Sequence, residues 1–347
     1  MRNKRTLCVY TFSHFCVDFS CFFALFSWFS SGSHPEQTVA LGFLVYNIIA
    51  FGFQPVIGFL CDEHGNIPFG ALGCLLLASG LLFLQTPVMA VCIMALGNAC
   101  FHIEGGIDSL RYADGKMARS GVFVSTGALG VAFGTLAGKS GGLSAYYVIA
   151  LLIVCMTLIF VFCRKKEEPG ITRSTFYIAR PELSFGAVVI LSSVSIMIRS
   201  YAGVILPLAW KTTTFFFMLP AVGAFIGKAS GGYLADRVGA KKIGVTSLLS
   251  AAVILTFGHT TPELYLMGII LFNMSMPITL CAVASCLPRN PGLAFGVTTL
   301  ALLCGNVPTF FYPPPVYSAV FFMLAVISVM CLNYILRGGT RARKKEE

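Results

Sequence analysis

Residues 232–242 read GYLADRVGAKK, a short polar segment that joins two long apolar runs. Residues 58–66 read GFLCDEHGN in a similar setting, 174 residues earlier. The identities in register are Gly58 with Gly232, Leu60 with Leu234, Asp62 with Asp236 and Gly65 with Gly239. Further matches, at a spacing of 171 residues, are Gly121 with Gly292 and Gly134 with Gly305. The repetition predicts that the chain contains two copies of one structural unit.

The composition places this chain in a bilayer. Of 347 residues, 56% are hydrophobic and only 11% are charged, and the mean hydropathy is +0.83. Soluble domains carry about 25% charged residues. The apolar runs extend for about 18 to 25 residues, the length that a helix needs to cross the membrane, and they lack the alternation of a β-barrel. We therefore expect an all-α polytopic membrane protein.

Hydropathy predicts twelve membrane spans, with ten or eleven as alternatives. They are expected at residues 7–30, 38–61, 68–85, 88–107, 121–139, 145–163, 184–206, 212–235, 242–260, 264–287, 293–311 and 316–336. The longest polar stretch, 164–183, separates six spans from six. We expect an N-terminal six-helix bundle over 1–163, a cytoplasmic linker over 164–183, and a C-terminal six-helix bundle with a basic tail over 184–347.

The distribution of positive charge predicts the orientation. Every Lys and Arg lies on one predicted side except Lys139, Arg199, Lys211 and Lys228. Because cytoplasmic loops carry an excess of Lys and Arg, both termini are expected in the cytoplasm. The net charge of +10 thus indicates topology and contact with the lipid bilayer, not a nucleic-acid partner. We expect a monomeric, multi-pass protein of the plasma (inner) membrane.

The residues of the second polar segment resemble the signature of the major facilitator superfamily, G-x-L-x-D-R-x-G-R/K-R/K, which lies between spans two and three and is often repeated between spans eight and nine. The resemblance implies twelve helices in two six-helix repeats and secondary transport. The first-half copy departs from the pattern at Glu63, His64 and 66–68, so the resemblance implies a weaker contact there. The residues implied to form a conformational latch are Gly58, Asp62, Gly65, Gly232, Asp236, Arg237, Gly239, Lys241 and Lys242.

Three other segments carry a narrower resemblance, to one branch of the superfamily. HFCVD (14–18), NACFHIEGG (98–106) and RSGVFVSTGALGVAFG (119–134) are similar to the fosmidomycin-resistance branch of the superfamily, which implies drug efflux. Antiporters of the superfamily often carry Gly-Pro in span five, whereas Thr135 follows Gly134 here. A glycine stripe in this span is expected to allow close helix packing. It consists of Gly127, Gly130, Gly134 and Gly138.

Few ionisable side chains fall inside the predicted spans, where each costs at least about 2.5 kcal/mol to insert. The candidates for substrate binding and proton coupling are His14, Asp18, His102, Glu104 and Arg199. They fall on spans one, four and seven, which line the central cavity in the superfamily. The alternative interpretation is a fixed Asp18–Arg199 ion pair, with both histidines bonded to backbone carbonyls. Lys228, near the end of span eight, is expected to reach water.

No cofactor, metal or enzymatic site is expected. His102 lies two residues from both Cys100 and Glu104 on a helix and points about 200° away from them, so the three cannot share an ion. None of the thirteen cysteines forms a C-x-x-C pair. Motifs of hydrolases, P-loop ATPases, zinc proteases and dinucleotide-binding enzymes are absent from the sequence.

The sequence therefore favours a secondary transporter of a small organic solute that works by alternating access, is coupled to protons, and exports its substrate. One alternative is a proton-coupled importer of an anionic metabolite, in which Arg199 binds the negative charge. The other is a membrane sensor or assembly protein that has kept the fold without transport.

Overall fold

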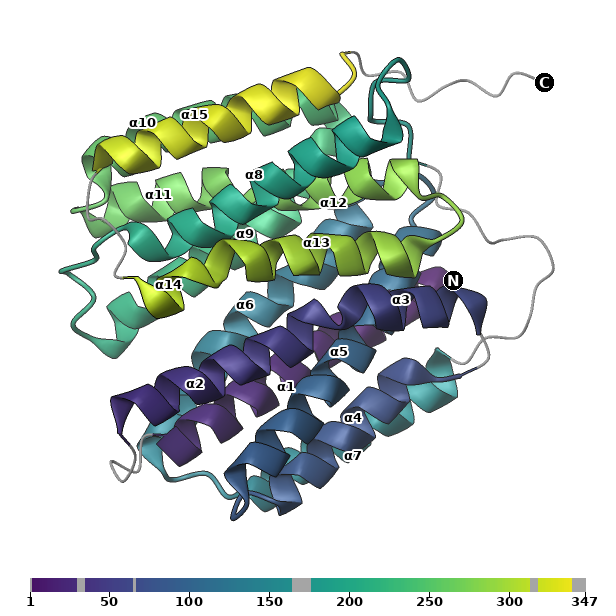
Figure 1. The fold of residues 1–347 in the computed structure, drawn as a ribbon, viewed down its shortest axis with the longest axis vertical. Coiled ribbons are helices and arrows are strands. Elements are labelled where there is room, and N and C mark those ends of the chain that lie inside the picture. Colours follow the sequence, from purple (N-terminus) through teal and green to yellow (C-terminus); the bar gives the residue numbers. More distant parts are fainter. Residues whose placement is uncertain (1, 30–34, 65–66, 164–175, 313–317, 339–347) are drawn as a thin grey trace.

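The computed structural model describes residues 2–29, 35–64, 67–163, 176–312 and 318–338 (Figure 1). Its elements in the first part of the chain are α1 (Arg2–Phe29), α2 (Glu36–Asn47), η1 (Ile48–Gly52), α3 (Gln54–Glu63), α4 (Phe69–Leu82), α5 (Pro87–Arg111), α6 (Met117–Ser140) and α7 (Ala145–Phe162). Those in the second part are α8 (Phe185–Ile205), α9 (Thr214–Val238), α10 (Ala240–Gly258), α11 (Pro262–Asn273), α12 (Ser275–Cys286), α13 (Pro291–Asn306), α14 (Pro308–Phe311) and α15 (Ser318–Ile335).

The all-helical architecture with twelve membrane helices is confirmed, with one difference in length. In the described residues, eleven helices are long and apolar enough to span a membrane. The third predicted span, 68–85, forms only the shorter helix α4 and ends in a turn after Leu82. Three spans are interrupted helices, namely α2–η1–α3, α11–α12 and α13–α14. Pro55 follows the π-helical turn η1, as expected for a residue that cannot donate to the helical ladder.

The helices gather into two groups that follow the chain (Figure 1). Helices α1–α7 lie on one side and α8–α15 on the other, and the two groups meet along α3 with α13 and α6 with α9. Of the predicted linker, 164–183, the part up to residue 175 lies outside the described residues. Its last part pairs with the end of α15, where Arg337 donates its backbone N–H to Ile178.

Glycines allow the two groups to touch backbone to backbone. A Cβ at Gly58 on α3 would overlap the Gly292 carbonyl on α13. A Cβ at Gly232 on α9 would lie 2.6 Å from the Met117 carbonyl oxygen at the start of α6. These crossings involve the glycines that match between the repeats, 58 with 232 and 121 with 292. The sequence repeat thus corresponds to a repeated contact between the groups.

The glycine stripe of α6 packs against α1. A Cβ at Gly130 would overlap the carbonyl of Phe15, and one at Gly134 would overlap the carbonyl of Phe19. At Gly138, a Cβ would lie 2.6 Å from the Phe23 carbonyl oxygen. Because these positions of α6 carry no side chains, α1 can pack close to α6. Two of the candidate site residues lie on α1.

Gly134→Ala is expected to destabilise the protein, because the added methyl group would force α6 away from the α1 backbone. Overpacking of this kind costs about 1–3 kcal/mol. Gly203→Ala on α8 is the matched control, since a Cβ there meets nothing within 4 Å. The control should gain a little from helix propensity. Thermal unfolding in detergent measures both, and equal melting temperatures would contradict the packing role.

Candidate functional site

Three candidate residues converge inside the first group of helices. His14 and Asp18 lie one turn apart on α1, and His102 faces them from α5. The His14 Nε2 atom is 3.2 Å from Asp18 Oδ2, the His102 Nε2 atom is 3.5 Å from Asp18 Oδ1, and the two Nε2 atoms are 2.9 Å apart. The two histidines are 5% and 6% exposed. We call these three residues the His–Asp–His cluster.

The outer nitrogen of each ring is fixed by a backbone carbonyl. His14 Nδ1 lies 2.6 Å from the Phe123 oxygen, and His102 Nδ1 lies 3.0 Å from the Asn98 oxygen. Because a carbonyl only accepts hydrogen bonds, both Nδ1 atoms must carry the proton. The Asn98 amide donates to Asp18 Oδ1 over 3.2 Å. Each of the three side chains in the cluster is therefore oriented by a hydrogen bond to a residue outside the cluster.

This tautomer assignment has an electrostatic consequence. With protons on both Nδ1 atoms, neutral rings direct their Nε2 lone pairs toward each other and toward a carboxylate. The two Nε2 atoms then lie 2.9 Å apart, and each lies within 3.5 Å of one oxygen of the Asp18 carboxylate, without a hydrogen between them. Buried polar groups left in this way cost free energy, so the arrangement requires a positive charge at its centre.

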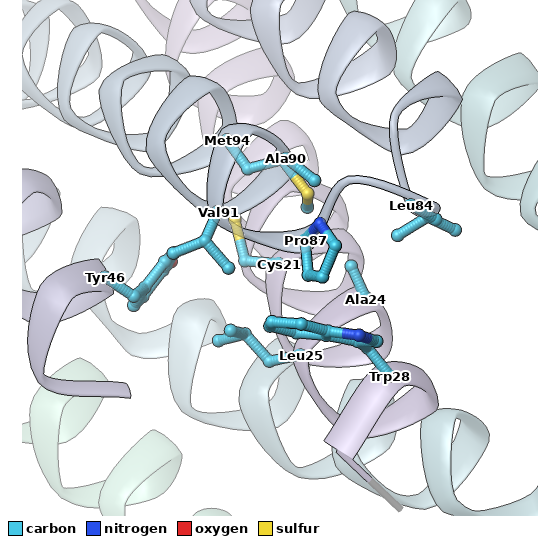
Figure 2. Close-up of a pocket in the computed structure, with 10 residues that line it drawn as sticks. All are labelled: Cys21, Ala24, Leu25, Trp28, Tyr46, Leu84, Pro87, Ala90, Val91 and Met94. Atoms are coloured by element: carbon cyan, nitrogen blue, oxygen red, sulfur yellow. The ribbon is translucent and has the colours of Figure 1, made fainter. Parts of the chain in front are cut away.

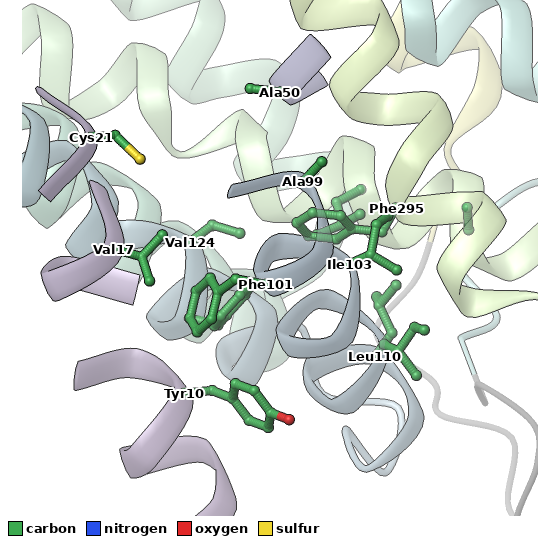
Figure 3. Close-up of a cluster of buried hydrophobic side chains, with 14 of the residues drawn as sticks. Tyr10, Val17, Cys21, Ala50, Ala99, Phe101, Ile103, Leu110, Val124 and Phe295 are labelled. Carbon is green, nitrogen blue, oxygen red and sulfur yellow. The ribbon is translucent and has the colours of Figure 1, made fainter. Parts of the chain in front are cut away.

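The surroundings of the cluster are apolar and tightly packed. The Phe123 ring of α6 stacks on His14 with centroids 4.7 Å apart. Gly127 lies against the cluster, where a Cβ would be 2.6 Å from His14 Nε2. Figure 3 shows neighbouring buried side chains from the same helices, including Val17 of α1 and Phe101 of α5. Low polarity around a charged group strengthens its interactions.

An apolar pocket lies further along α1 (Figure 2). Leu25 and Trp28 of α1, Tyr46 of α2 and Met94 of α5 form its walls. Cys21, at its edge, accepts a hydrogen bond from the Asn98 amide over 3.5 Å. The pocket is thus connected to the His–Asp–His cluster through Asn98.

Glu104 does not join the cluster. Its Oε2 atom accepts a hydrogen bond from the backbone N–H of Gly70, in the first turn of α4, close to Tyr10. A carboxylate at a helix N-terminus is stabilised by the helix dipole. The sequence analysis also did not select Asp108, which lies one turn beyond Glu104 and is 5% exposed. The sequence feature that could have identified Asp108 is its spacing of four residues from Glu104, which places both acids on one face of the helix.

Arg199 lies in the second group of helices. It is 8% exposed, and its Nη1 atom donates to Ser275 Oγ over 3.4 Å and to Thr279 Oγ1 over 3.3 Å, both on α12. Asp18 pairs with the two histidines instead, and no ion pair between Arg199 and Asp18 is found among the described residues. Lys228 on α9 is partly buried and acts electrostatically on His102.

Two residues predicted to form the latch, Asp62 and Asp236, make reciprocal contacts between the groups. Asp62 at the end of α3 accepts hydrogen bonds from the backbone N–H groups of Gly292 (3.0 Å) and Leu293 (2.9 Å) at the start of α13. Asp236 near the end of α9 accepts them from Met117 (2.8 Å) and Ala118 (2.9 Å) at the start of α6. The two copies make equivalent contacts, although the first lacks the basic residues of the pattern.

The predicted latch residues that follow Asp236 lie at or beside the turn between α9 and α10. Gly239 has φ +113° and joins α9 to α10, a conformation that favours glycine. The Arg237 guanidinium lies 4.2 Å from the centre of the Tyr233 ring. Lys241 and Lys242 are in the first turn of α10. Gly65 lies outside the described residues.

No protein-family model matches the sequence, and no curated protein sequence matches it. Solved structures do match. The E. coli fucose:proton symporter FucP superimposes with a TM-score of 0.64 at 12% identity, covering 92% of this chain and 98% of that one. FucP in the outward conformation, described as a major facilitator superfamily transporter, gives 0.62 at 12% identity over the same shares. An outward-facing bacterial homologue of the iron transporter ferroportin gives 0.59 at 16% identity, covering 96% of each chain.

These similarities show the fold of the major facilitator superfamily over nearly the whole chain. At such low identity they show the fold alone. The narrower resemblance to the fosmidomycin-resistance branch gains no support from them and stays a prediction.

Proposed function

We propose that this chain, which has the major facilitator superfamily fold, is a secondary transporter that moves a small solute by alternating access. Its six-helix units, 1–163 and 184–347, would rock against each other around a central site. The observation that carries the proposal is the reciprocal pair of carboxylate contacts made by Asp62 and Asp236. Each unit contributes one carboxylate and one helix N-terminus.

The two ends of the junction are held by different chemistry. Asp62 and Asp236 make charge-assisted hydrogen bonds at the end of the junction where α1 begins and α15 ends (Figure 1). At the opposite end, Lys139 of α6 lies 5.8 Å from the Phe217 ring of α9, and Lys211 lies 4.6 Å from the same ring. Burial and the charge of Lys139 lower the pKa of Lys211. The cation–π contact of Lys139 with Phe217 joins the two groups, whereas the like charges of Lys139 and Lys211 repel each other, so this end is held less strongly than the end with Asp62 and Asp236.

The driving force we propose is an ion gradient, with the His–Asp–His cluster as the place where the ion binds. The cluster requires a positive charge, so the coupling ion is a cation. Protons are the ion that the sequence favours, and the similar FucP structure belongs to a fucose:proton symporter. An organic solute remains the proposed substrate class, and export remains the proposed direction.

A second candidate function is uptake of an anionic metabolite. The observation that favours it is the buried Arg199, whose described hydrogen-bond partners are the neutral hydroxyls of Ser275 and Thr279. Burying a cation without a carboxylate is costly, and a bound anion would compensate it. Lys228 adds a second positive charge on the neighbouring helix α9.

Transport itself is tested with the purified protein in proteoliposomes, assayed for exchange of labelled metabolites and antimicrobials across an imposed ion gradient. The proposal expects saturable exchange that requires the protein. If no solute is exchanged by a protein that is folded and oriented in the vesicles, the sensor or assembly alternative replaces the proposal.

For the anion candidate, Arg199→Gln is expected to remove thermal stabilisation by anionic metabolites, because a ligand stabilises a protein by mass action. A shift of several degrees in the wild type should fall to near zero. Arg289→Gln, at an exposed loop position, is the matched control. Stabilisation by the same anions in both variants would show that Arg199 does not bind them.

A further inference from the structure

The His–Asp–His cluster has the geometry of a transition-metal site. A tetrahedral ion bound at about 2.0–2.1 Å holds its ligand atoms about 3.3 Å apart. The distances among His14 Nε2, His102 Nε2 and the nearest Asp18 oxygens are 2.9, 3.2 and 3.5 Å, which bracket this value. All the potential ligand atoms lie within 4.8 Å of one another. Side-chain shifts of a few tenths of an ångström would bring these three ligands to the separations that such an ion requires.

The hydrogen bonds outside the cluster direct its lone pairs inward. Both histidines donate from Nδ1 to a backbone carbonyl, at Phe123 and at Asn98, which leaves Nε2 as the free ligand atom. Metal-binding histidines almost always make such an outer hydrogen bond, which fixes the tautomer and orients the ring. The Asn98 amide likewise orients the Asp18 carboxylate. The three ligands are therefore preorganised.

The donor atoms indicate the class of ion. Two imidazole nitrogens and one carboxylate suit divalent first-row transition metals with open coordination positions. Calcium and magnesium prefer sites made of oxygen ligands. A divalent ion would also supply the positive charge that the facing lone pairs require.

The sequence could not identify this set. The sequence grouped His102 with His14 and Asp18 as candidates for proton coupling, but as a metal ligand it was considered only with Cys100 and Glu104, its neighbours on the same helix. The residues that meet His102 lie on α1, more than eighty positions earlier in the chain. The spacing of four between His14 and Asp18 placed that pair on one face, but no periodicity could predict which helix would face it.

A lysine on helix α9 adds a positive charge that lowers the affinity of the His–Asp–His cluster for a cation. Lys228 on α9 belongs to the other group of helices and acts electrostatically on His102 and on Asp18. A positive charge near the cluster weakens the binding of a cation. Because α9 belongs to the other unit, the rocking motion proposed above would change this repulsion and help to release the ion.

We propose that His14, Asp18 and His102 bind a divalent first-row transition-metal ion, such as Mn²⁺, Fe²⁺, Co²⁺ or Zn²⁺. Binding to the cluster stands independently of transport. The role of the ion as transported cargo rests on the proposed function, and at this site the metal would replace the proton as the bound cation.

Titration of the chelator-stripped, purified full chain with Co²⁺ tests the proposal, because the visible absorption of Co²⁺ reports its ligands. One ion per chain is expected, and Mg²⁺ and Ca²⁺ should not displace it. His102→Gln and Asp18→Asn should each weaken binding by about 100-fold or more. His64→Gln and His259→Gln, outside the cluster, should leave it unchanged. Gel filtration and thermal unfolding verify that each variant is folded.

Absence of Co²⁺ binding by the folded wild type, or equal binding by all four variants, would overturn the metal site. Uptake of Mn²⁺ into proteoliposomes then separates the two proposals. Metal binding without flux of Mn²⁺ or of any organic solute would contradict the transport function and leave the site intact. Exchange of an organic solute by a protein that binds no metal would contradict the site and leave the transport function intact.

Discussion

Combining Asp62→Asn with Asp236→Asn is expected to release the terminal end of the junction between the two units. Each aspartate accepts two backbone hydrogen bonds, one on each oxygen. An asparagine offers only one acceptor oxygen and would place its NH₂ group against the second N–H donor. The loss also removes a negative charge from a helix N-terminus, where it is stabilising.

The expected size of this effect follows from the contacts. Charge-assisted capping contacts at partly exposed positions contribute about 1–2 kcal/mol each. Losing both shifts the equilibrium between the closed and open forms by about 2–4 kcal/mol, or roughly 30- to 1000-fold. Such a shift is comparable to the free-energy difference between the states of many two-state proteins. The double variant should therefore populate the form that is open at this end and lose most net transport.

Hydrogen exchange at the capped amides measures the release directly. The N–H groups of Met117, Ala118, Gly292 and Leu293 should exchange much faster in the double variant. Glu263→Gln, which alters an acid in the first turn of α11, is the matched control. Unchanged protection at the four amides would contradict the latch, whereas single variants should show intermediate rates.

Asp18→Asn is expected to abolish ion-coupled transport and leave the fold intact. Asparagine has nearly the same shape, so packing against α6 is preserved. Its amide can donate to a histidine Nε2 atom, which satisfies the lone pair that otherwise requires a cation. The cluster would lose both its negative charge and its need for a positive one. This reasoning applies to a proton and to a metal ion alike.

The measurement compares two modes of flux in proteoliposomes. Accumulation driven by an ion gradient should fall at least 100-fold, whereas exchange of solute at equal concentrations should persist. Asp114→Asn is the control, because Asp114 lies in a loop and its side chain is 67% exposed beside Arg119. If the ion dependence of transport in Asp18→Asn equals that of the wild type, the cluster is not the coupling site.

The sequence predicted correctly those structural features that depend on the spacing of residues close together in the chain. The apolar runs predicted where the membrane helices lie, since a helix must satisfy its own backbone in lipid. The exception was 68–85, where the third helix ends early at Leu82. The repeated GxLxD pattern located Asp62 and Asp236, and the structure places each against a helix N-terminus of the other group.

The candidate site required information that spacing does not contain. The sequence grouped His102 with Glu104 on the same span, but residues two apart on a helix point in different directions. In the structure, His102 turns toward α1, while Glu104 turns toward the start of α4. Asp18 could have paired with Arg199 on charge alone, yet Arg199 reaches hydroxyls on α12.

By itself, the sequence determined the helical class, the number of membrane helices, the internal repeat and the carboxylates between the units. These features follow from hydrophobic length and from residues close together in the chain. Only the tertiary structure decided that His14, Asp18 and His102 form one cluster with its lone pairs directed inward. The reason is physical: the rotation of each helix is set by packing, here by glycines of α6 against α1, and packing joins residues far apart in sequence.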